Sequence, residues 1–208
     1  MNYPGVVLGY HGCDRAVGER ILSGRDHVRA SSNDYDWLGY GAYFWENSPQ
    51  RALEWAEFQR DHPDYAQTQI TTPSVIGAII QPIWTLDLTD AGCLRMLRNA
   101  YDDMSESIAD SHSDLPVNEM GHPNDPDFVK RRLDCAVINY LHAMRSVTRR
   151  KPFDCVRSAF FEGRPLYPGA GITAKAHIQW CVRDPARNIC GYFVPLPRRE
   201  DYELPLPE

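Results

Sequence analysis

The chain of 208 residues carries a net charge of −6, with 43% hydrophobic and 24% charged residues. These values are ordinary for a globular protein, and the length predicts one domain that spans residues 1–208. No apolar run approaches the roughly 18 residues of a membrane span, and the negative charge gives no general attraction to nucleic acid. The N-terminal residues lack a signal-peptide pattern, so we expect a cytoplasmic protein without a membrane partner. The six cysteines are scattered with no Cys-x-x-Cys pair, which indicates neither a metal site nor a disulfide framework.

Strands and helices alternate in the first part of the chain. Short apolar runs predict buried strands, and polar capping residues or proline mark where helices begin. The predicted elements are, in order, a strand at 5–10, a helix at 14–22 capped by Asp14, a loop at 33–41, a strand at 42–45, a helix at 50–60 and one or two strands within 75–88.

The middle of the chain has a different character. Apolar residues at helical spacing predict helices at 90–104 and 128–147, and the stretch between them at 111–127 predicts a loop because it is rich in Pro, Asp, Asn and Gly. Strands return in three segments, at 154–163, 177–184 and 188–195. This order predicts an α+β fold in which a helical insertion, about residues 89–150, interrupts a β-rich core.

Three short motifs stand out, far apart in the sequence. The first is His11-Gly12, at the end of an apolar run. The second, Gly39–Phe44, has the sequence GYGAYF and precedes a helix with the pattern Ala-x-x-Trp-Ala at Ala52–Ala56. The third lies in the late strand at 177–184 and runs from Gln179 with the sequence QWCVRDP.

Together these motifs resemble the ADP-ribosyltransferase fold, in the diphtheria-toxin and poly(ADP-ribose) polymerase branch that is known by a His-Tyr-Glu trio. The whole pattern is also similar to small bacterial ADP-ribosyltransferase toxins. The resemblance implies a split β-sheet core and an NAD-dependent mono-ADP-ribosyltransferase, a toxin or defence effector that uses NAD as its substrate and needs no metal. Its acceptor would be a protein or a nucleic acid, and the resemblance allows a cognate antitoxin or inhibitor as a further partner.

The resemblance implies that NAD contacts His11, Gly12, Gly41, Tyr43 and Trp55. Tyr43 would stack on one face of the nicotinamide ring and Trp55 on the other, each face being worth about 0.5–2 kcal/mol. His11 would hydrogen-bond a ribose hydroxyl, and the glycines would let the backbone approach the ligand closely. His11, Tyr43 and Trp55 are also compatible with plain core roles, and this alternative stays open at this point.

The third motif departs from the trio, because Gln179 stands where the resemblance implies glutamate. Breaking the bond to nicotinamide develops oxocarbenium character at the ribose, which a carboxylate stabilises. A glutamine can bond the ribose 2′-hydroxyl but supplies no charge. A full charge about 4 Å away is worth on the order of 4 kcal/mol at an effective dielectric of 20. That is about a thousandfold in rate.

Three explanations for the missing charge compete. Another carboxylate can enter the site, and Glu162 is the first candidate, although it is equally compatible with a surface position at a strand end. The acceptor can supply its own carboxylate, or the protein can bind NAD or ADP-ribose without catalysis. An NAD glycohydrolase, in which water replaces the acceptor, is a further alternative. The predicted catalytic residues are therefore His11, Tyr43, Gln179 and Glu162.

The segment at 164–176, before the third motif, corresponds to the part of the family that contacts the acceptor. Its Gly and Pro content predicts a mobile loop. His177 lies two residues before Gln179 and is expected to share its strand face. The absence of glutamate at the third motif favours mono-ADP-ribosylation over polymer formation.

Overall fold

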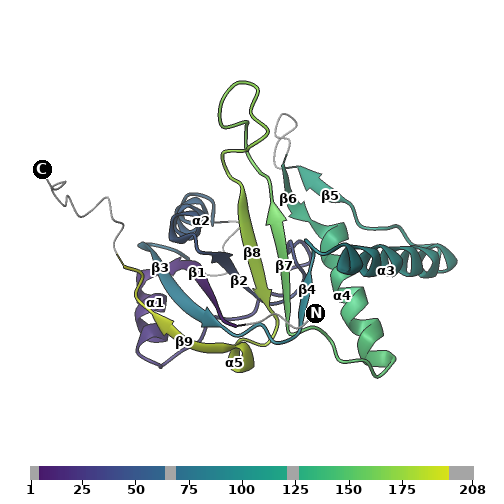
Figure 1. Cartoon of the computed structure of the whole chain (residues 1–208), viewed down its shortest axis with the longest axis horizontal. Coiled ribbons are helices and arrows are strands. Elements are labelled where there is room, and N and C mark those ends of the chain that lie inside the picture. The colour runs from purple at the N-terminus through teal and green to yellow at the C-terminus, as the bar shows by residue number, and fades with distance from the viewer. Residues whose placement is uncertain (1–4, 64–68, 121–126, 197–208) are drawn as a thin grey trace, which may run out of the picture.

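The computed structural model describes residues 5–63, 69–120 and 127–196 (Figure 1). The strands are β1 (Val7–Asp14), β2 (Ala42–Glu46), β3 (Pro73–Ile80), β4 (Thr85–Asp87), β5 (Asn118–Met120), β6 (Phe128–Arg131), β7 (Cys155–Phe160), β8 (His177–Val182) and β9 (Ile189–Phe193). The helices are α1 (Arg15–Leu22), α2 (Pro49–Asp61), α3 (Ala91–Asp110), α4 (Arg132–Val147) and α5 (Pro185–Asn188).

The predicted α+β class is confirmed within these ranges. Seven strands form one sheet in the order β4-β7-β8-β2-β1-β3-β9, and β5 and β6 form a separate hairpin. The pair β4–β7 is parallel and the other pairs are antiparallel, so the sheet is not doubly wound. None of the helices in the described ranges is long and apolar enough to cross a membrane.

Three predicted boundaries were wrong. The strand predicted at 5–10 continues to Asp14, because β3 pairs with β1 along its whole length. The helix predicted at 90–104 continues to Asp110. The first four residues of the helix predicted at 128–147 form β6 instead, since they pair with β5 inside the predicted loop. Residues 121–126 of that loop lie outside the described residues.

The two halves of the sheet meet at a short ladder. β1 pairs with β3 from Val7↔Ile80 to Asp14↔Pro73, but it pairs with β2 only at Gly9↔Glu46 and Tyr10↔Trp45. The resemblance implied a split β-sheet core, but the seven strands of the described residues form one sheet, in which the pairing of β1 with β2 ends at Tyr10 and their backbones diverge beyond it.

Apolar clusters cover both faces of the sheet, because successive residues of a strand point to opposite sides. Phe44 and Trp180 belong to one cluster together with Ile21 of α1. Cys181, the next residue on β8, belongs to the other cluster with Ile138 of α4. Figure 1 shows α3 and α4 side by side at one end of the sheet, between β4 and β7 in the chain, where the helical insertion was predicted.

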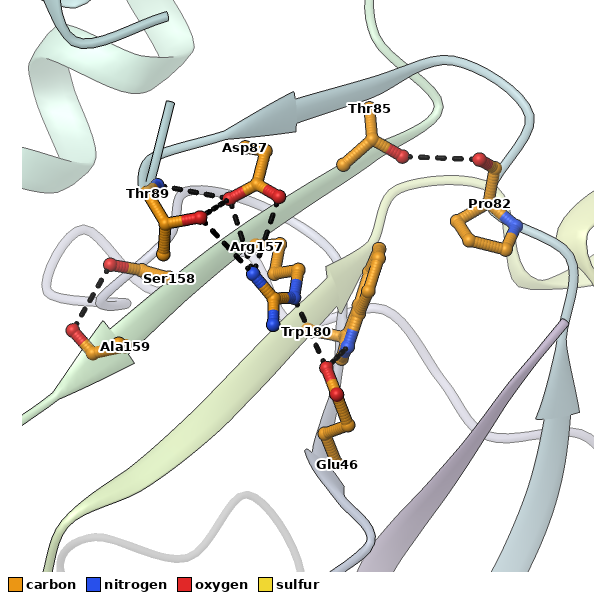
Figure 2. A network of polar contacts seen from close by, with 9 residues as sticks. All are labelled: Glu46, Pro82, Thr85, Asp87, Thr89, Arg157, Ser158, Ala159 and Trp180. Carbon is orange, nitrogen blue, oxygen red and sulfur yellow. Dashed lines mark hydrogen bonds and ion pairs between the residues drawn. The ribbon is translucent and has the colours of Figure 1, made fainter. Parts of the chain in front are cut away.

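A half-buried polar network ties four strands together (Figure 2). Glu46 Oε2 accepts hydrogen bonds from Trp180 Nε1 at 2.7 Å and from Arg157 Nε at 3.1 Å. Arg157 Nη1 also donates to Asp87 Oδ2 at 3.2 Å. Ion pairs withdrawn from water need such additional hydrogen bonds to be stable. The network fixes β2, β4, β7 and β8 relative to one another.

Asp14 joins β1 to α1 and to the segment before β3. Its Oδ1 accepts a hydrogen bond from Ala16 N at 2.9 Å, which confirms the predicted N-cap. Its Oδ2 accepts from Thr71 N, Thr71 Oγ1 and Thr72 N at 2.8, 2.8 and 2.9 Å. The hydrogen bonds from Thr72 and Thr71 hold the pKa of Asp14 well below its usual value.

We expect Asp14→Asn to lower the free energy of unfolding by about 1.5–3 kcal/mol at pH 7, because an amide places a donor against the donors of Thr71 and Thr72. The depressed folded-state pKa stabilises the protein fully above the unfolded-state pKa of about 3.9, and this contribution is lost as the pH falls further. The difference between wild type and variant should therefore shrink toward pH 3. Urea unfolding between pH 7 and pH 3 measures it, with Glu19→Gln on the exposed face of α1 as the control. Equal losses in both variants would contradict the assignment.

Candidate functional site

The sheet brings the three sequence motifs onto three neighbouring strands. In the order β8-β2-β1, Gln179 lies on β8, Tyr43 on β2 and His11 on β1. These residues come from positions far apart in the chain, and the strand order places their strands side by side. Tyr43 and Gln179 share one strand face, whereas His11, one residue after Tyr10, lies on the face that carries Phe44 and reaches only the backbone of Tyr43.

His11 contacts β2 where the backbones of β1 and β2 diverge. Its Nδ1 lies 2.9 Å from the carbonyl oxygen of Tyr43, and its ring lies 5.6 Å from that of Phe44. Since a carbonyl only accepts, Nδ1 is the donor, and Nε2 of the neutral ring is left as an acceptor. Burial lowers the pKa of His11, and the hydrogen bond to Tyr43 offsets this only in part. His11 is therefore a neutral imidazole with a defined tautomer at pH 7.

The Tyr43 ring is held in place by its hydroxyl. The hydroxyl donates to Gly39 O at 2.6 Å and accepts from Leu38 N at 2.8 Å. Burial raises the pKa of Tyr43 well above its usual value, so the hydroxyl stays protonated. The ring is therefore fixed at both ends, by the strand and by the preceding turn.

The motif glycines are required by packing within the protein. A Cβ at Gly12 would lie 2.0 Å from the carbonyl oxygen of Ala52, so α2 contacts β1 directly there. A Cβ at Gly41 would lie 2.5 Å from Cys181 Sγ. Gly39 has a φ of +76°, and its Cβ would lie 2.9 Å from Asn139 Oδ1 of α4. These glycines were predicted to let the backbone approach a ligand closely. In the structure they instead allow close contact with α2, α4 and β8.

Trp55, which the resemblance placed on one face of nicotinamide, packs against other aromatic side chains of the protein. Its ring stacks on Phe58 at 5.4 Å and tilts against Trp45 at 6.2 Å. Trp45 is 4% exposed, and its Nε1 has no hydrogen-bond partner among the described residues. Trp45 was not predicted as a site residue, although its position two residues after Tyr43 on β2 places both on one strand face.

Gln179 is buried on the strand face that carries Tyr43 and Trp45. It lies opposite Trp45 of β2 and Ser158 of β7. Its neighbour on the same face is His177, which lies opposite Phe160. His177 and Gln179 thus lie in a row along this face of β8. They are about 7 Å apart, because they are two residues apart on one strand.

Glu162 is buried beside His177, which excludes the exposed strand-end alternative. It is 9% exposed, and its Oε2 lies 3.8 Å from His177 Nδ1 and 3.9 Å from Arg51 Nη2. Burial raises the pKa of Glu162 to about 7, with nearby Asp127 adding to the rise. Burial likewise lowers the pKa of His177 to about 4.

Glu162 and Gln179 lie at different levels of the sheet. Glu162 is four residues beyond Ser158, the partner of Gln179. This separation corresponds to about 13 Å along an extended backbone. The carboxylate of Glu162 contacts His177, which lies two residues before Gln179 on β8.

Two arginines beside Glu162 were missed by the sequence analysis. The guanidinium of Arg131 lies 4.3 Å from the ring centre of Trp37 and 4.8 Å from that of Phe160. The Nε atoms of Arg131 and Arg51 and the Nε2 of His177 are buried without a hydrogen-bond partner among the described residues. No local pattern identifies these arginines, since one ends β6 and the other lies in the first turn of α2.

Residues 161–176, here called the arm, connect β7 to β8 and project beyond the ends of these strands (Figure 1). The segment at 164–176 was predicted as a mobile loop, but its backbone is hydrogen-bonded across the arm. Leu166 N donates to Ile172 O at 2.9 Å, and Ala174 N donates to Arg164 O at 2.9 Å. The turn residues lie at its tip, and the ladder between β7 and β8 continues into its base.

Comparisons of the chain with protein-family models, with curated proteins and with solved structures found no match. Within the described ranges, no group of three or more His, Cys, Asp or Glu side chains could hold a metal ion.

We expect Gly12→Ala to lower the free energy of unfolding by about 3 kcal/mol, because the new methyl group would overlap the Ala52 carbonyl and push α2 away from β1. Chemical denaturation measures the change. Gly191→Ala is the matched control, since a Cβ there meets nothing within 4 Å. Wild-type stability in Gly12→Ala would contradict the packing role.

Proposed function

We propose that the protein is an NAD-dependent mono-ADP-ribosyltransferase that transfers ADP-ribose to a macromolecular acceptor and releases nicotinamide. The observation that carries the proposal is the hydrogen bond between His11 and the Tyr43 carbonyl at the point where β1 and β2 diverge, with Gln179 on the next strand. The sequence resemblance selects these three residues, and their positions on three neighbouring strands support the proposal.

Each residue has a role suited to its environment. The free Nε2 of neutral His11 accepts a hydrogen bond from a ribose hydroxyl. Tyr43 offers its ring, immobilised through its hydroxyl, for stacking on nicotinamide. Gln179 bonds the ribose 2′-hydroxyl without charge, and the indole of Trp55 or Trp45 supplies a second aromatic face.

The reaction needs NAD and a nucleophile. The nucleophile attacks C1′ of the nicotinamide ribose while the bond from C1′ to the ring nitrogen breaks. The bonding electrons pass to the cationic ring, which leaves as neutral nicotinamide. A toxin or defence effector that is held inactive by a cognate antitoxin or inhibitor fits this activity and belongs to the proposal.

The uncharged Gln179 favours one second candidate, a module that binds NAD or ADP-ribose without catalysis. Incubation with labelled NAD and a cell lysate, followed by separate protease and nuclease treatment, tests transfer. Label in macromolecules supports the transferase, whereas release of nicotinamide without labelling identifies a glycohydrolase. Binding of NAD without either product identifies the binding module.

We expect Tyr43→Ala to weaken NAD binding by about 1–3 kcal/mol, the scale of losing one stacking face. Tyr43→Phe should keep most of the affinity, because the ring remains and only the hydrogen bonds to Leu38 and Gly39 are lost. Isothermal titration calorimetry measures the affinity, and thermal unfolding checks that each variant is folded. Tyr40→Ala, at an exposed position of the same motif, is the control. Unchanged binding by a folded Tyr43→Ala variant would remove the nicotinamide assignment.

We expect Gln179→Glu to raise the rate of NAD hydrolysis, because a carboxylate at this position would stabilise positive charge on the ribose. The Coulomb energy of on the order of 4 kcal/mol sets an upper limit of about a thousandfold. Burial of the new carboxylate raises its pKa and reduces the gain, so the increase should be larger at pH 8 than at pH 6. Nicotinamide release measures it, and a rate equal to that of wild type at both pH values would show that Gln179 does not face the ribose.

A further inference from the structure

The end of α4 and the beginning of α3 form a basic surface, here called the basic corner. Arg145 Nη1 of α4 lies 3.9 Å from Met96 Sδ of α3. A Cβ at Gly92 would lie 3.8 Å from Arg95 Nη2. Gly92 and Met96 are one helical turn apart, so both guanidinium groups lie on the same side of α3. The basic corner consists of five cationic residues: Arg95, Arg145, Arg149, Arg150 and Lys151.

Most of these charges are not neutralised within the protein. No Asp or Glu occurs between Asp134 and Asp154, although the whole chain carries a charge of −6. Lys151 pairs with Asp154 at 3.0 Å. The four arginines have no carboxylate within 4.0 Å in the part of the chain that the structure describes, and Arg145 alone of the four is partly covered. The basic corner therefore presents an excess of positive charge to solvent.

An ordered turn holds two of the arginines in place. Arg149 N donates to Ser146 O at 3.1 Å, and Arg150 N donates to Arg145 O at 2.7 Å. These two bonds form the Schellman ending of α4, in which one residue adopts a left-handed conformation. That residue is Arg149, with a φ of +56°, where glycine is usual because a Cβ is strained. Burial and the nearby charge of Arg150 lower the pKa of Arg145, so the turn also keeps like charges close together.

Helix stability does not explain the positions of these cations. The helix dipole favours acidic residues in the first turns of a helix and basic residues in the last, and Arg145 in the last turn of α4 follows this preference. In α3 the order is reversed, because Arg95 and Arg98 lie in its first half and its acidic residues begin at Asp102. Arginine also occupies the glycine position of the turn after α4. Cations placed against local stability are expected at binding sites.

We propose that the basic corner binds the phosphate backbone of a nucleic acid. The unpaired cations are all arginines, and a guanidinium group can donate two parallel hydrogen bonds to phosphate oxygens. The net charge of −6 does not prevent this binding, since charges beyond about 8–10 Å are largely screened at physiological ionic strength. Binding at this corner requires no NAD and is separate from the transfer of ADP-ribose.

The apolar residues around the basic corner favour a nucleic acid over an anionic membrane. Leu94, Met144 and Val147 are the exposed large apolar residues of α3 and α4, both of which lie entirely within the described ranges. Helices that lie in a membrane interface present a wide apolar face with Trp, Phe and Leu. The exposed residues of α3 and α4 include no aromatic side chain. A polyanion that is contacted through charge alone fits this surface better.

The test measures the binding of full-length protein to fluorescein-labelled oligonucleotides, single-stranded and duplex, by fluorescence anisotropy between about 50 and 200 mM salt. We expect the affinity to fall as the salt concentration rises, because phosphate contacts release counterions. The double variant Arg149→Gly/Arg150→Ser should bind at least about tenfold more weakly near the lowest salt concentration. Its slope of log K against log salt should be smaller by about 2.

The single variant Arg149→Gly separates charge from folding. Glycine suits the left-handed position, so the midpoint of thermal unfolding should stay the same or rise. The salt slope should nevertheless fall by about 1, because one phosphate contact is lost. A residue with a structural role alone would not give this combination.

The matched control is Arg25→Ser/Arg29→Ser, which removes the same charge from two exposed positions after α1. Figure 1 shows α1 at the other end of the sheet from α3 and α4. This variant should keep the affinity and the salt slope of the wild type.

Three outcomes would overturn the inference. The first is a wild-type protein that binds neither oligonucleotide at the lowest salt concentration, and the second is an equal loss of affinity in the control and in Arg149→Gly/Arg150→Ser. The third is sedimentation of the protein with phosphatidylserine vesicles without binding to oligonucleotides, which would identify a membrane as the partner. The proposed function is tested separately, by labelling with NAD and by release of nicotinamide.

Discussion

The divergence of β1 and β2 beyond Tyr10 is the constraint on which the site depends. A carbonyl on β2 would lose its partner there, and His11 supplies one through Nδ1 at 2.9 Å from Tyr43 O. Buried backbone carbonyls need such a partner. The same bond sets the tautomer of His11 and directs Nε2 away from β2. One hydrogen bond therefore pairs the Tyr43 carbonyl and fixes the His11 ring.

The glycine motifs link the fold to this constraint. Gly12 lets α2 lie against β1, and Gly39 and Gly41 let the turn before β2 lie against α4 and β8. That turn also binds the hydroxyl of Tyr43, so a larger residue at Gly39 or Gly41 would move Tyr43 as well as the neighbouring helix or strand. The motif is thus a packing requirement, which explains why its residues lie together irrespective of any ligand.

Two sets of polar side chains lie on opposite faces of the sheet, because successive residues of a strand point to opposite sides. Arg157, Glu46 and Trp180 form a satisfied network on one face (Figure 2). Gln179 and Ser158, each adjacent to a network residue in sequence, point to the other face. On that face Glu162 lies 3.8 Å from His177 and 3.9 Å from Arg51, and one side-chain nitrogen each of Arg51, Arg131 and His177 has no partner within the described part of the chain.

The α+β class, the N-cap at Asp14 and most elements followed from the sequence, because apolar periodicity and capping are local properties of the chain. The boundary of β6 did not, since a four-residue strand exists only through its pairing with β5. Glu162 was a candidate from its position alone, but its burial beside His177, Arg51 and the stacked Arg131 arises from β8, α2 and β6 converging on it. Local pattern determines what each segment can form. Tertiary packing determined which charges lie together in low dielectric, because that depends on segments remote in the chain.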